Sequence, residues 1–543
     1  MVKNDEFYKI CSTISYIVVI FVVGIPMWWK STEIHRAVLP SDEIAVLDKT
    51  PITFTMKIGI FIDNNERQKT VVEELEVFFR NNDIFNAKLI PIQASQSEMA
   101  NVRTPASLEK MLSKYYVAKP GDLLVAEWKN LEDEVLVANE RTLFVSPKAS
   151  SEKIYQVIRS WIVRDYKIRS ILGLVRTFDG KQLRHNFPPP SPEYEIMLSI
   201  LNPKPDLQTL HWNVKKATED YLEPFLKEFS YLSDFKIKSQ WKYQVQLTYS
   251  SRQIKDTSKV GRHFAMDKDS LPHIITSIER KLGTDVANKP CIHLVVYAPP
   301  CNSAPVYIYK DSKRVSNFTF DSFISAKWGG IVIANPPDAT CATILNEDDA
   351  TEPKEIYLHS HAIMDFVLYE LRKIFELEVE VPINNAALVS LEQITPRLWE
   401  KDMYLRNGAV HLIASASSTL QSLIKLLDDI KNIVIGDHVG HEIHAAYENV
   451  VKAKEYLAVN DIDKAVKHAR IAYIAAEKAF NDPSLLELLY FPEEQKYAIY
   501  IPLYLPIMIP VIFSFNSIKK YFKKNKEQDE QKEEVDEVSK KDD

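Results

Sequence analysis

The sequence predicts a mixed α/β fold followed by a helical region, with one transmembrane helix near each end of the chain. Three observations support this fold class. Two uncharged apolar runs lie near the ends of the 543 residues, strand-like runs alternate with helical segments over residues 57–390, and a helical period dominates residues 391–496. The mean hydropathy of -0.19 is too low for a bundle of many membrane helices. We therefore expect two anchors around a large water-soluble part.

The charge balance excludes a nucleic-acid partner. The net charge is -7 and the isoelectric point is about 6.1, whereas proteins that bind phosphate backbones carry clustered Lys and Arg. Contact with membrane lipid is expected from the apolar runs instead.

The first apolar run, residues 10–29, has no charged side chain and is long enough to cross a bilayer, which takes a helix of about 20 residues. Lys9 and Lys30 bracket it. Trp28 and Trp29 lie at its end, where aromatic rings anchor a helix at the membrane interface. A cleaved signal peptide is the alternative, but bulky residues stand where small residues mark a cleavage site. We interpret the run as an uncleaved anchor.

The second apolar run, residues 497–518, sets the predicted topology. A cluster of lysines follows it: Lys519, Lys520, Lys523 and Lys524. Positively charged flanks stay in the cytoplasm during insertion, so we expect the Lys-rich and acidic tail, residues 519–543, to be cytoplasmic. The part after Lys526 has almost no apolar residues, and we expect it to be disordered. With two crossings, residues 1–9 are cytoplasmic as well. Residues 30–496 then lie on the lumenal or extracellular side.

Three prolines recur at every fourth position inside the second run, at Pro502, Pro506 and Pro510. Each lacks a backbone donor and leaves a carbonyl one turn earlier without its helical partner. In lipid such a carbonyl needs another partner. We therefore predict that this helix packs against other membrane helices, with a kinked helix standing alone as the alternative.

Between the anchors we expect a connector at residues 30–56, an α/β subdomain at 57–187 and, after a proline-rich break, a second α/β subdomain at 188–390. Apolar runs predict strands at residues 58–62, 87–92, 123–126, 143–145, 194–201, 235–248, 292–297, 306–309 and 331–334. Helical spacing predicts helices at residues 68–80, 105–116, 213–228 and 361–377.

Residues 391–496 are expected to be helical almost throughout. Apolar side chains recur at three- and four-residue spacing over residues 409–433, 439–457 and 462–480. Asn460 and Asp461 mark a turn, so the last two helices form a hairpin. A short apolar helix at residues 484–490 should lie at the membrane surface.

No motif for nucleotide binding is recognisable, and we predict no cofactor. The 12 glycines include no phosphate-binding loop. His438, His441 and His444 lie close together in the sequence, but not in the order in which two helical histidines face a metal beside a glutamate. We interpret them as a solvated helix face rather than a metal site.

Two acidic pairs resemble those with which lumenal glycosyltransferases hold a metal. They are Asp267 with Asp269 and Asp461 with Asp463. So short a pattern arises often by chance, and the second pair lies at a helix start, where acids are favoured in any case. We predict no metal site at either pair.

The cysteines leave three alternatives open. Cys11 lies in the first apolar run, and Cys291, Cys301 and Cys341 lie in the soluble part. One bridge with a spare thiol, such as Cys291 with Cys301, is compatible with an oxidising lumen. Three buried thiols or an intermolecular bridge are the others. No cysteine stands in the sequence context of a caspase nucleophile, and we predict no catalytic residue.

Asn317, followed by Phe318 and Thr319, starts the only N-glycosylation sequon of the chain. A sequon indicates a surface loop of a secretory-pathway protein. We predict that Asn317 carries a glycan.

Motifs along the whole chain resemble the PIG-S family, the class S phosphatidylinositol-glycan subunits of the GPI transamidase. Near the second anchor the similar segments are residues 480–485, 489–492 and 495–503. Elsewhere they are Gly24-Ile25-Pro26 with Trp28-Trp29-Lys30, Leu201-Asn202-Pro203 with Trp212, Leu271-Pro272-His273, Trp328-Gly329-Gly330 and Asn432-Ile433-Val434-Ile435.

The resemblance implies an endoplasmic-reticulum membrane protein whose main domain is lumenal. It implies a non-catalytic subunit of the complex that replaces a C-terminal signal of a proprotein with a preassembled GPI anchor. The catalytic cysteine and histidine are then expected on another, caspase-like subunit, which would be a partner together with the remaining subunits. Contact with the proprotein or with GPI is compatible with this role.

Two other function classes stay open at this point. One is an independent lumenal enzyme, such as a metal-dependent glycosyltransferase that uses Asp267 and Asp269. The other is a cargo receptor or scaffold. Neither accounts for the family motifs.

Overall fold

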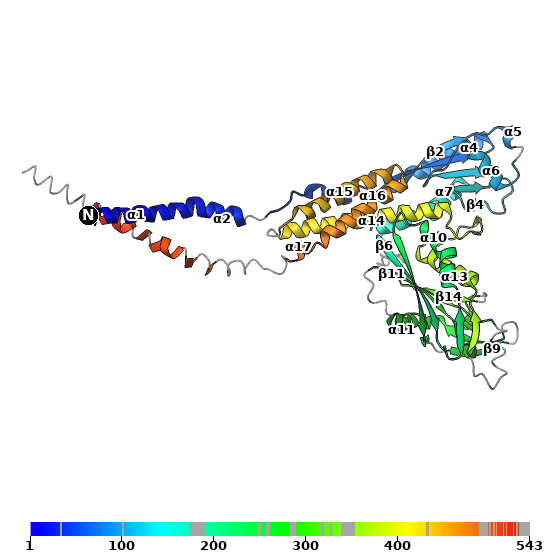
Figure 1. Ribbon diagram of the computed structural model, residues 1–543. Coiled ribbons are helices and arrows are strands. Elements are labelled where there is room, and N and C mark those ends of the chain that lie inside the picture. The colour runs from blue at the N-terminus through cyan, green and yellow to red at the C-terminus, as the bar shows by residue number, and fades with distance from the viewer. Residues whose placement is uncertain are drawn as a thin grey trace, which may run out of the picture. The chain divides into compact units, whose positions relative to one another are not determined.

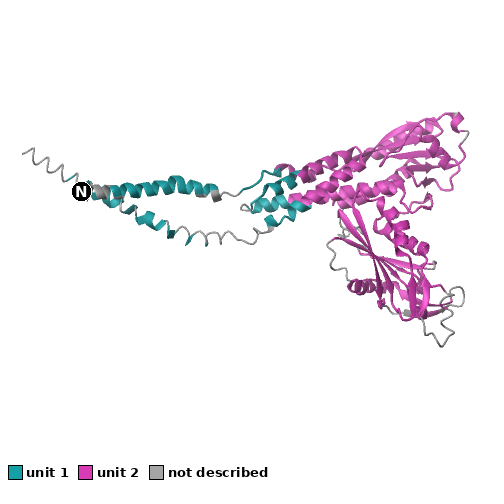
Figure 2. Cartoon of the chain, in the orientation of Figure 1, with its two compact units in different colours: residues 1–41, 422–444, 477–543 teal, residues 42–421, 445–476 magenta. Residues whose placement is uncertain are grey.

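The computed structural model describes residues 2–32, 35–99, 102–173, 191–247, 251–256, 261–282, 289–316, 320–325, 328–337, 341, 353–430 and 434–487, residue 498, and short stretches over 501–530 (Figure 1). The chain divides into two compact units (Figure 2). One comprises residues 1–41, 422–444 and 477–543, and the other comprises residues 42–421 and 445–476.

The N-terminal segment is one continuous helical run. It comprises α1 (Val2–Val19), a π-helical turn η1 (Ile20–Gly24) and α2 (Ile25–Thr32). The window Ile10–Met27 has a mean hydropathy of 2.3 and none of it is buried. By length and composition this helix is able to cross a membrane, as predicted from residues 10–29.

A six-stranded sheet forms the first α/β layer, in the order β17-β4-β5-β3-β1-β2. Its strands are β1 (Phe54–Phe61), β2 (Phe85–Ile92), β3 (Leu123–Glu127), β4 (Val135–Val137), β5 (Thr142–Val145) and β17 (Ala386–Leu388). The strands β2, β1, β3 and β5 run parallel. The strands β3 and β5 are buried at every position, which explains their nearly continuous apolar sequences, since both faces of the sheet are covered there. The main helices of this layer are α4 (Asn65–Arg80), α6 (Pro105–Leu112), α7 (Ser151–Val157) and α8 (Asp165–Ile171).

A five-stranded sheet, in the order β14-β15-β11-β6-β8, forms the second layer. Its strands are β6 (Glu193–Asn202), β8 (Asp234–Tyr243), β11 (Cys291–Tyr297), β14 (Asp321–Ser325) and β15 (Gly329–Ile333). The helices include α9 (Val214–Ala217), η4 (Thr218–Leu222), α10 (Glu223–Lys227), α11 (Leu271–Leu282) and α13 (Ser360–Ile374). The edge strand β14 is antiparallel to β15, whereas β15, β11, β6 and β8 are parallel.

Two smaller sheets accompany the second layer. One has the order β13-β12-β10-β9, and the other pairs β16 with β7. Their strands are β7 (Gln208–His211), β9 (Ser251–Asp256), β10 (Gly261–Asp267), β12 (Val306–Lys310), β13 (Lys313–Arg314) and β16 (Lys354–Tyr357).

Three long helices follow, α14 (Leu398–Asp429), α15 (Asp437–Ala458) and α16 (Ile462–Phe480), and then the short α17 (Pro483–Glu487). Alanines such as Ala453 on α15 and Ala469 on α16 are fully buried, and the ring of Tyr456 on α15 stacks on that of His468 on α16. Asn460 adopts a left-handed φ of 59° in the turn between them. The predicted hairpin is confirmed.

A buried ion-pair network joins the second layer to the long helices. Glu400 on α14 is fully buried, and its two carboxylate oxygens accept hydrogen bonds from Arg372 of α13 and from Arg397 at distances of 2.7–3.1 Å. Arg397 also donates to the carbonyl of Val389 and to Asn139 of the first layer. The helix α14 starts at Leu398, earlier than the predicted residue 409. Its first turns bury charged side chains of this network, so the sequence there lacks the apolar spacing from which a helix is predicted.

The disulfide differs from the pairing of Cys291 with Cys301 that the sequence left open. Cys301 is bonded to Cys341, with their Cα atoms 5.1 Å apart. Cys291 begins β11 and Cys301 lies beyond its end. Because a strand rises about 3.3 Å per residue, those two residues lie far outside the roughly 4.4–6.8 Å range of a disulfide. The alternative of three free thiols is excluded as well, because two of the three cysteines are bonded to each other.

Candidate interaction surfaces

The predicted membrane residues lie on exposed helical segments. Trp29, on α2, has 69% of its surface exposed, and Trp28 belongs to the same helix. The described residues near the C-terminus are helical, and they include Pro502, Pro506 and Pro510, all exposed, and the exposed Lys519, Lys520, Lys523 and Lys524. Among the described residues, one helix meets the length and hydropathy expected of a membrane span, and it is the N-terminal one.

The segment that follows the first helix is attached to the start of α15. The N–H of Ala37 donates to the carbonyl of Ile435, and the N–H of Ile435 donates to the carbonyl of His35, both at 3.0 Å. His444 lies 2.9 Å from the carbonyl oxygen of Val38. These contacts connect the segment after the N-terminal helical run to the first turns of α15.

The histidine cluster makes structural contacts. His444 contacts the connector, and His438 lies 3.1 Å from the carboxylate of Asp482 near α17. His441 is exposed on α15. Across the described ranges, no group of three or more His, Cys, Asp or Glu residues is arranged to hold a metal.

The acidic pairs have ordinary positions. Asp267 ends β10, and Asp269 lies in the next turn, both exposed. Asp461 accepts a hydrogen bond from the N–H of Lys464 at the start of α16, and the hydrogen bond from the Lys464 side chain lowers the pKa of Asp461. Asp461 is thus a helix cap, as its place at a helix start suggests.

Cysteine chemistry is restricted in the described part of the chain. Cys301 and Cys341 are bonded to each other. Burial raises the pKa of the Cys291 thiol to about 11, so this thiol stays protonated near neutral pH and is a poor nucleophile. Cys11 lies in the N-terminal apolar helix.

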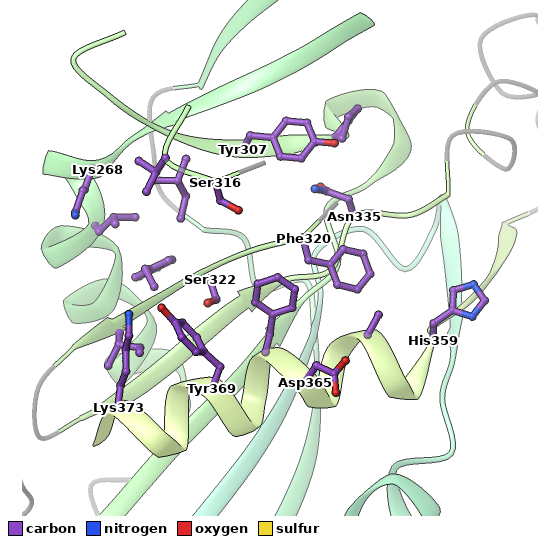
Figure 3. Close-up of a pocket in the computed structure, with 18 of the residues that line it drawn as sticks. Lys268, Tyr307, Ser316, Phe320, Ser322, Asn335, His359, Asp365, Tyr369 and Lys373 are labelled. Atoms are coloured by element: carbon purple, nitrogen blue, oxygen red, sulfur yellow. The ribbon is translucent and has the colours of Figure 1, made fainter. Parts of the chain in front are cut away.

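A groove of about 1470 Å³ opens in the second layer (Figure 3). Its walls come from α13, from the turn before α11 and from β12, and its floor includes β14. The lining residues include Lys268, Leu271, Tyr307, Ser316, Phe320, Ser322, Phe323, Ile324, Asn335, His359, Asp365, Phe366, Tyr369 and Lys373. The apolar pattern of the sequence indicates no strand at residues 321–325, so this groove was not predicted.

Two buried side chains join the sheets beside the groove. Asn335 Oδ1 accepts a 2.8 Å hydrogen bond from the N–H of Val306, and its Nδ2 donates to the Val306 carbonyl at 3.0 Å. Asp321 accepts a 2.6 Å hydrogen bond from the N–H of Ile308. Burial raises the pKa of Asp321. The two side chains hold β12 beside the first residue of β14, Asp321. The groove runs along the residues of β14 that follow, from Ser322 to Ile324.

Charge is distributed unevenly along the groove. Lys268 and Lys373 lie at one end, on opposite walls, and Asp365 and His359 lie toward the other end (Figure 3). Asp365 pairs with His361 at 2.8 Å. Within the described residues, neither lysine has an ion-pair partner. The Lys373 ammonium group lies 4.3 Å from the centre of the Tyr369 ring.

Comparison with known proteins decides the family. The sequence model of PIG-S, the phosphatidylinositol-glycan biosynthesis class S protein, matches residues 15–525. The chain belongs to the PIG-S family. It is 29% identical to the mouse protein named GPI-anchor transamidase component PIGS, over 94% of this chain and 96% of the mouse protein. The match to the human protein of the same name is also 29% identical, over 92% and 93% of the two chains.

Fungal members of the PIG-S family are similar over the same extent. The fission yeast protein named GPI transamidase component PIG-S homolog is 23% identical over 94% of this chain and 84% of its own length. The budding yeast protein named GPI transamidase component GPI17 is 21% identical over 93% and 91%. The similarity therefore includes both the terminal segments and the folded layers.

Proposed function

We propose that this chain is a non-catalytic subunit of a GPI transamidase complex in the endoplasmic-reticulum membrane, required for attaching preassembled GPI anchors to proproteins. The match of the PIG-S family over residues 15–525 carries the proposal. The state of the cysteines supports the non-catalytic role, because transamidation through a thioester needs a thiolate, and the described cysteines do not supply an activated one. The thiol nucleophile then belongs to a caspase-like partner subunit.

Copurification and complementation test this proposal. In cells that lack the chain, we expect surface levels of GPI-anchored proteins to fall and the tagged full-length chain to restore them. The tagged chain should copurify with the other transamidase subunits in mild detergent. Cys291→Ser should restore anchoring as well as the unsubstituted chain, because this buried thiol has no catalytic task. Recovery of the chain alone contradicts the subunit role, and loss of anchoring by Cys291→Ser at normal abundance contradicts the non-catalytic role.

The proposal includes two membrane crossings, with both termini cytoplasmic and residues 30–496 lumenal. The lysines after residues 497–518 support this orientation. In the complex, we propose that the helix with Pro502, Pro506 and Pro510 packs against partner helices, which supply donors for the carbonyls that these prolines leave unpaired.

Glycosylation tests the orientation. Asn317 lies outside the described residues, and its glycan remains a prediction. We expect the chain from cells to migrate faster after treatment with an N-glycosidase, and Asn317→Gln to migrate like the treated chain. Glu537→Asn creates a second sequon with Val538 and Ser539 in the tail, and it should remain unmodified because a cytoplasmic tail does not meet the lumenal glycosylation enzyme.

The opposite pattern would contradict the orientation. A glycan on the new sequon of the Glu537→Asn variant places the tail in the lumen. A chain that shows no mobility shift at all removes the support that Asn317 gives to a lumenal main domain.

A further inference from the structure

The groove in the second layer follows the edge of a β-sheet, along a strand whose outer side no other described strand pairs with. Ser322, Phe323 and Ile324 are consecutive residues of β14, and all three line the groove. Side chains of consecutive strand residues point to opposite faces of a sheet. A cavity that reaches all three therefore approaches the strand from its edge.

The two helices that wall the groove confirm this geometry, because they cover opposite faces of the sheet. Phe323 belongs to the apolar core that includes Ile274 and Ile278 of α11. On the other face, a Cβ atom added to Gly330 would lie 2.2 Å from the carboxylate of Glu370, which belongs to α13. The groove is lined from both sides, so it lies between the two helices along the outside of β14.

The two edges of this sheet are protected differently. The opposite edge strand, β8, carries Lys236, Lys238 and Lys242, and lysines on an edge strand prevent pairing with other chains. The strand β14 has the sequence DSFIS, with no lysine or proline. Its one charged residue, Asp321, is buried and bonded to Ile308. Within the described residues, the buried charge of Asp321 is the only such protection on this edge, and no lysine, proline or further strand covers the rest of it.

We propose that in the assembled complex an extended segment of another subunit pairs with β14 as an additional strand and places an acidic side chain at Lys268 and Lys373. The inference rests on the proposed function, since it names how a partner subunit attaches. An unprotected edge favours a permanent partner over a transient substrate. A strand against the five residues of β14 would extend roughly 16 Å at about 3.3 Å per residue. Main-chain hydrogen bonds supply the affinity and the groove walls supply the selectivity.

Site-specific photocrosslinking in the intact complex tests the inference. A benzophenone amino acid replaces Tyr369, which is 43% exposed on the groove wall, or Tyr243, which is 59% exposed outside the groove, as the control. We expect a crosslink from position 369 to another transamidase subunit, at a segment that contains an acidic residue and strand-forming residues. Position 243 should not label that segment.

Reversing the charge of the two groove lysines provides a second test. Lys268→Glu combined with Lys373→Glu should lower the yield of this crosslink about tenfold, since two favourable charge pairs become repulsive. The matched control is Lys227→Glu combined with Lys425→Glu, two exposed lysines outside the groove, and it should leave the yield unchanged.

The outcomes separate this inference from the proposed function. If the other subunits copurify but position 369 labels only this chain or nothing, the inference is overturned and the proposed function stands. A crosslink to the proprotein overturns the choice of a subunit as the occupant. If no subunit copurifies with the unsubstituted chain, the proposed function fails and the inference fails with it.

Discussion

Glu400→Ala is expected to destabilise the folded chain by about 3–5 kcal/mol, the usual cost of removing one partner from a buried ion pair. The side chains of Arg372 and Arg397 are 9% and 7% exposed, and both donate to the Glu400 carboxylate. Without it, two guanidinium groups remain in a poorly solvated place. Because Arg372 belongs to α13 and Arg397 also bonds to Asn139, the substitution should loosen the contact between the two α/β layers and α14.

Thermal unfolding of the detergent-solubilised full-length chain measures this effect. For a unit of the size that residues 42–421 and 445–476 form, with an entropy of unfolding of about 2.1 cal/mol/K per residue, a loss of 3–5 kcal/mol lowers Tm by about 3–6 °C. Glu448→Ala is the control, because Glu448 forms an exposed pair with Lys452 on α15, and such pairs contribute about 0.3–0.5 kcal/mol. Equal shifts for the two variants would show that the Glu400 network adds no more stability than a surface pair.

Strands and helices with a continuous apolar pattern were predictable from the sequence. Residues 123–126 and 143–145 are apolar, and residues 292–297 are apolar except for His293, because parallel strands are covered on both faces. The structure has strands at each. The hairpin of α15 and α16 followed from its helical period. Such elements can be recognised from their own sequence, because burial favours apolar residues at regular positions along them.

Elements whose burial depends on distant partners were not predictable. Residues 321–325 contain two serines and an aspartate, and nothing local indicates that Asp321 is bonded to a backbone N–H of β12. Residues 386–388 join the first sheet although they follow the second in sequence. The first turns of α14 bury Glu400 in an ion pair with Arg372 of α13, and Asp402 in an ion pair with Arg141, which directly precedes β5. Their polar sequence concealed a helix start.

The candidate site, too, could be predicted from the sequence only in part. The family motifs indicated the function, but the groove depends on two strand edges and two helices that only the tertiary structure brings together. The disulfide likewise required the position of Cys301 beyond the end of β11. Sequence spacing alone could not distinguish a pairing across ten residues from one across 40.

Gly329→Ala is expected to have the second large effect, through a collision inside the second layer. A Cβ atom at this position would lie 1.8 Å from the backbone carbonyl oxygen of His293, which belongs to the neighbouring strand β11. Gly329 also has a φ of 147°, which L-residues rarely adopt. Backbone atoms cannot move aside as a flexible side chain can. We therefore expect a loss of about 3 kcal/mol or more, at the upper end of the cost of overpacking.

Gly261→Ala separates the collision from the backbone strain. Gly261 has a φ of 70°, but no described atom lies within 4 Å of the place that an added Cβ atom would occupy. It should therefore cost only about 1–2 kcal/mol, the strain of a left-handed residue. In thermal unfolding of the full-length chain, Tm should fall clearly further for Gly329→Ala. If both variants lose the same stability, backbone strain alone accounts for the need for glycine at position 329. The close contact between β15 and β11 would then not be the reason.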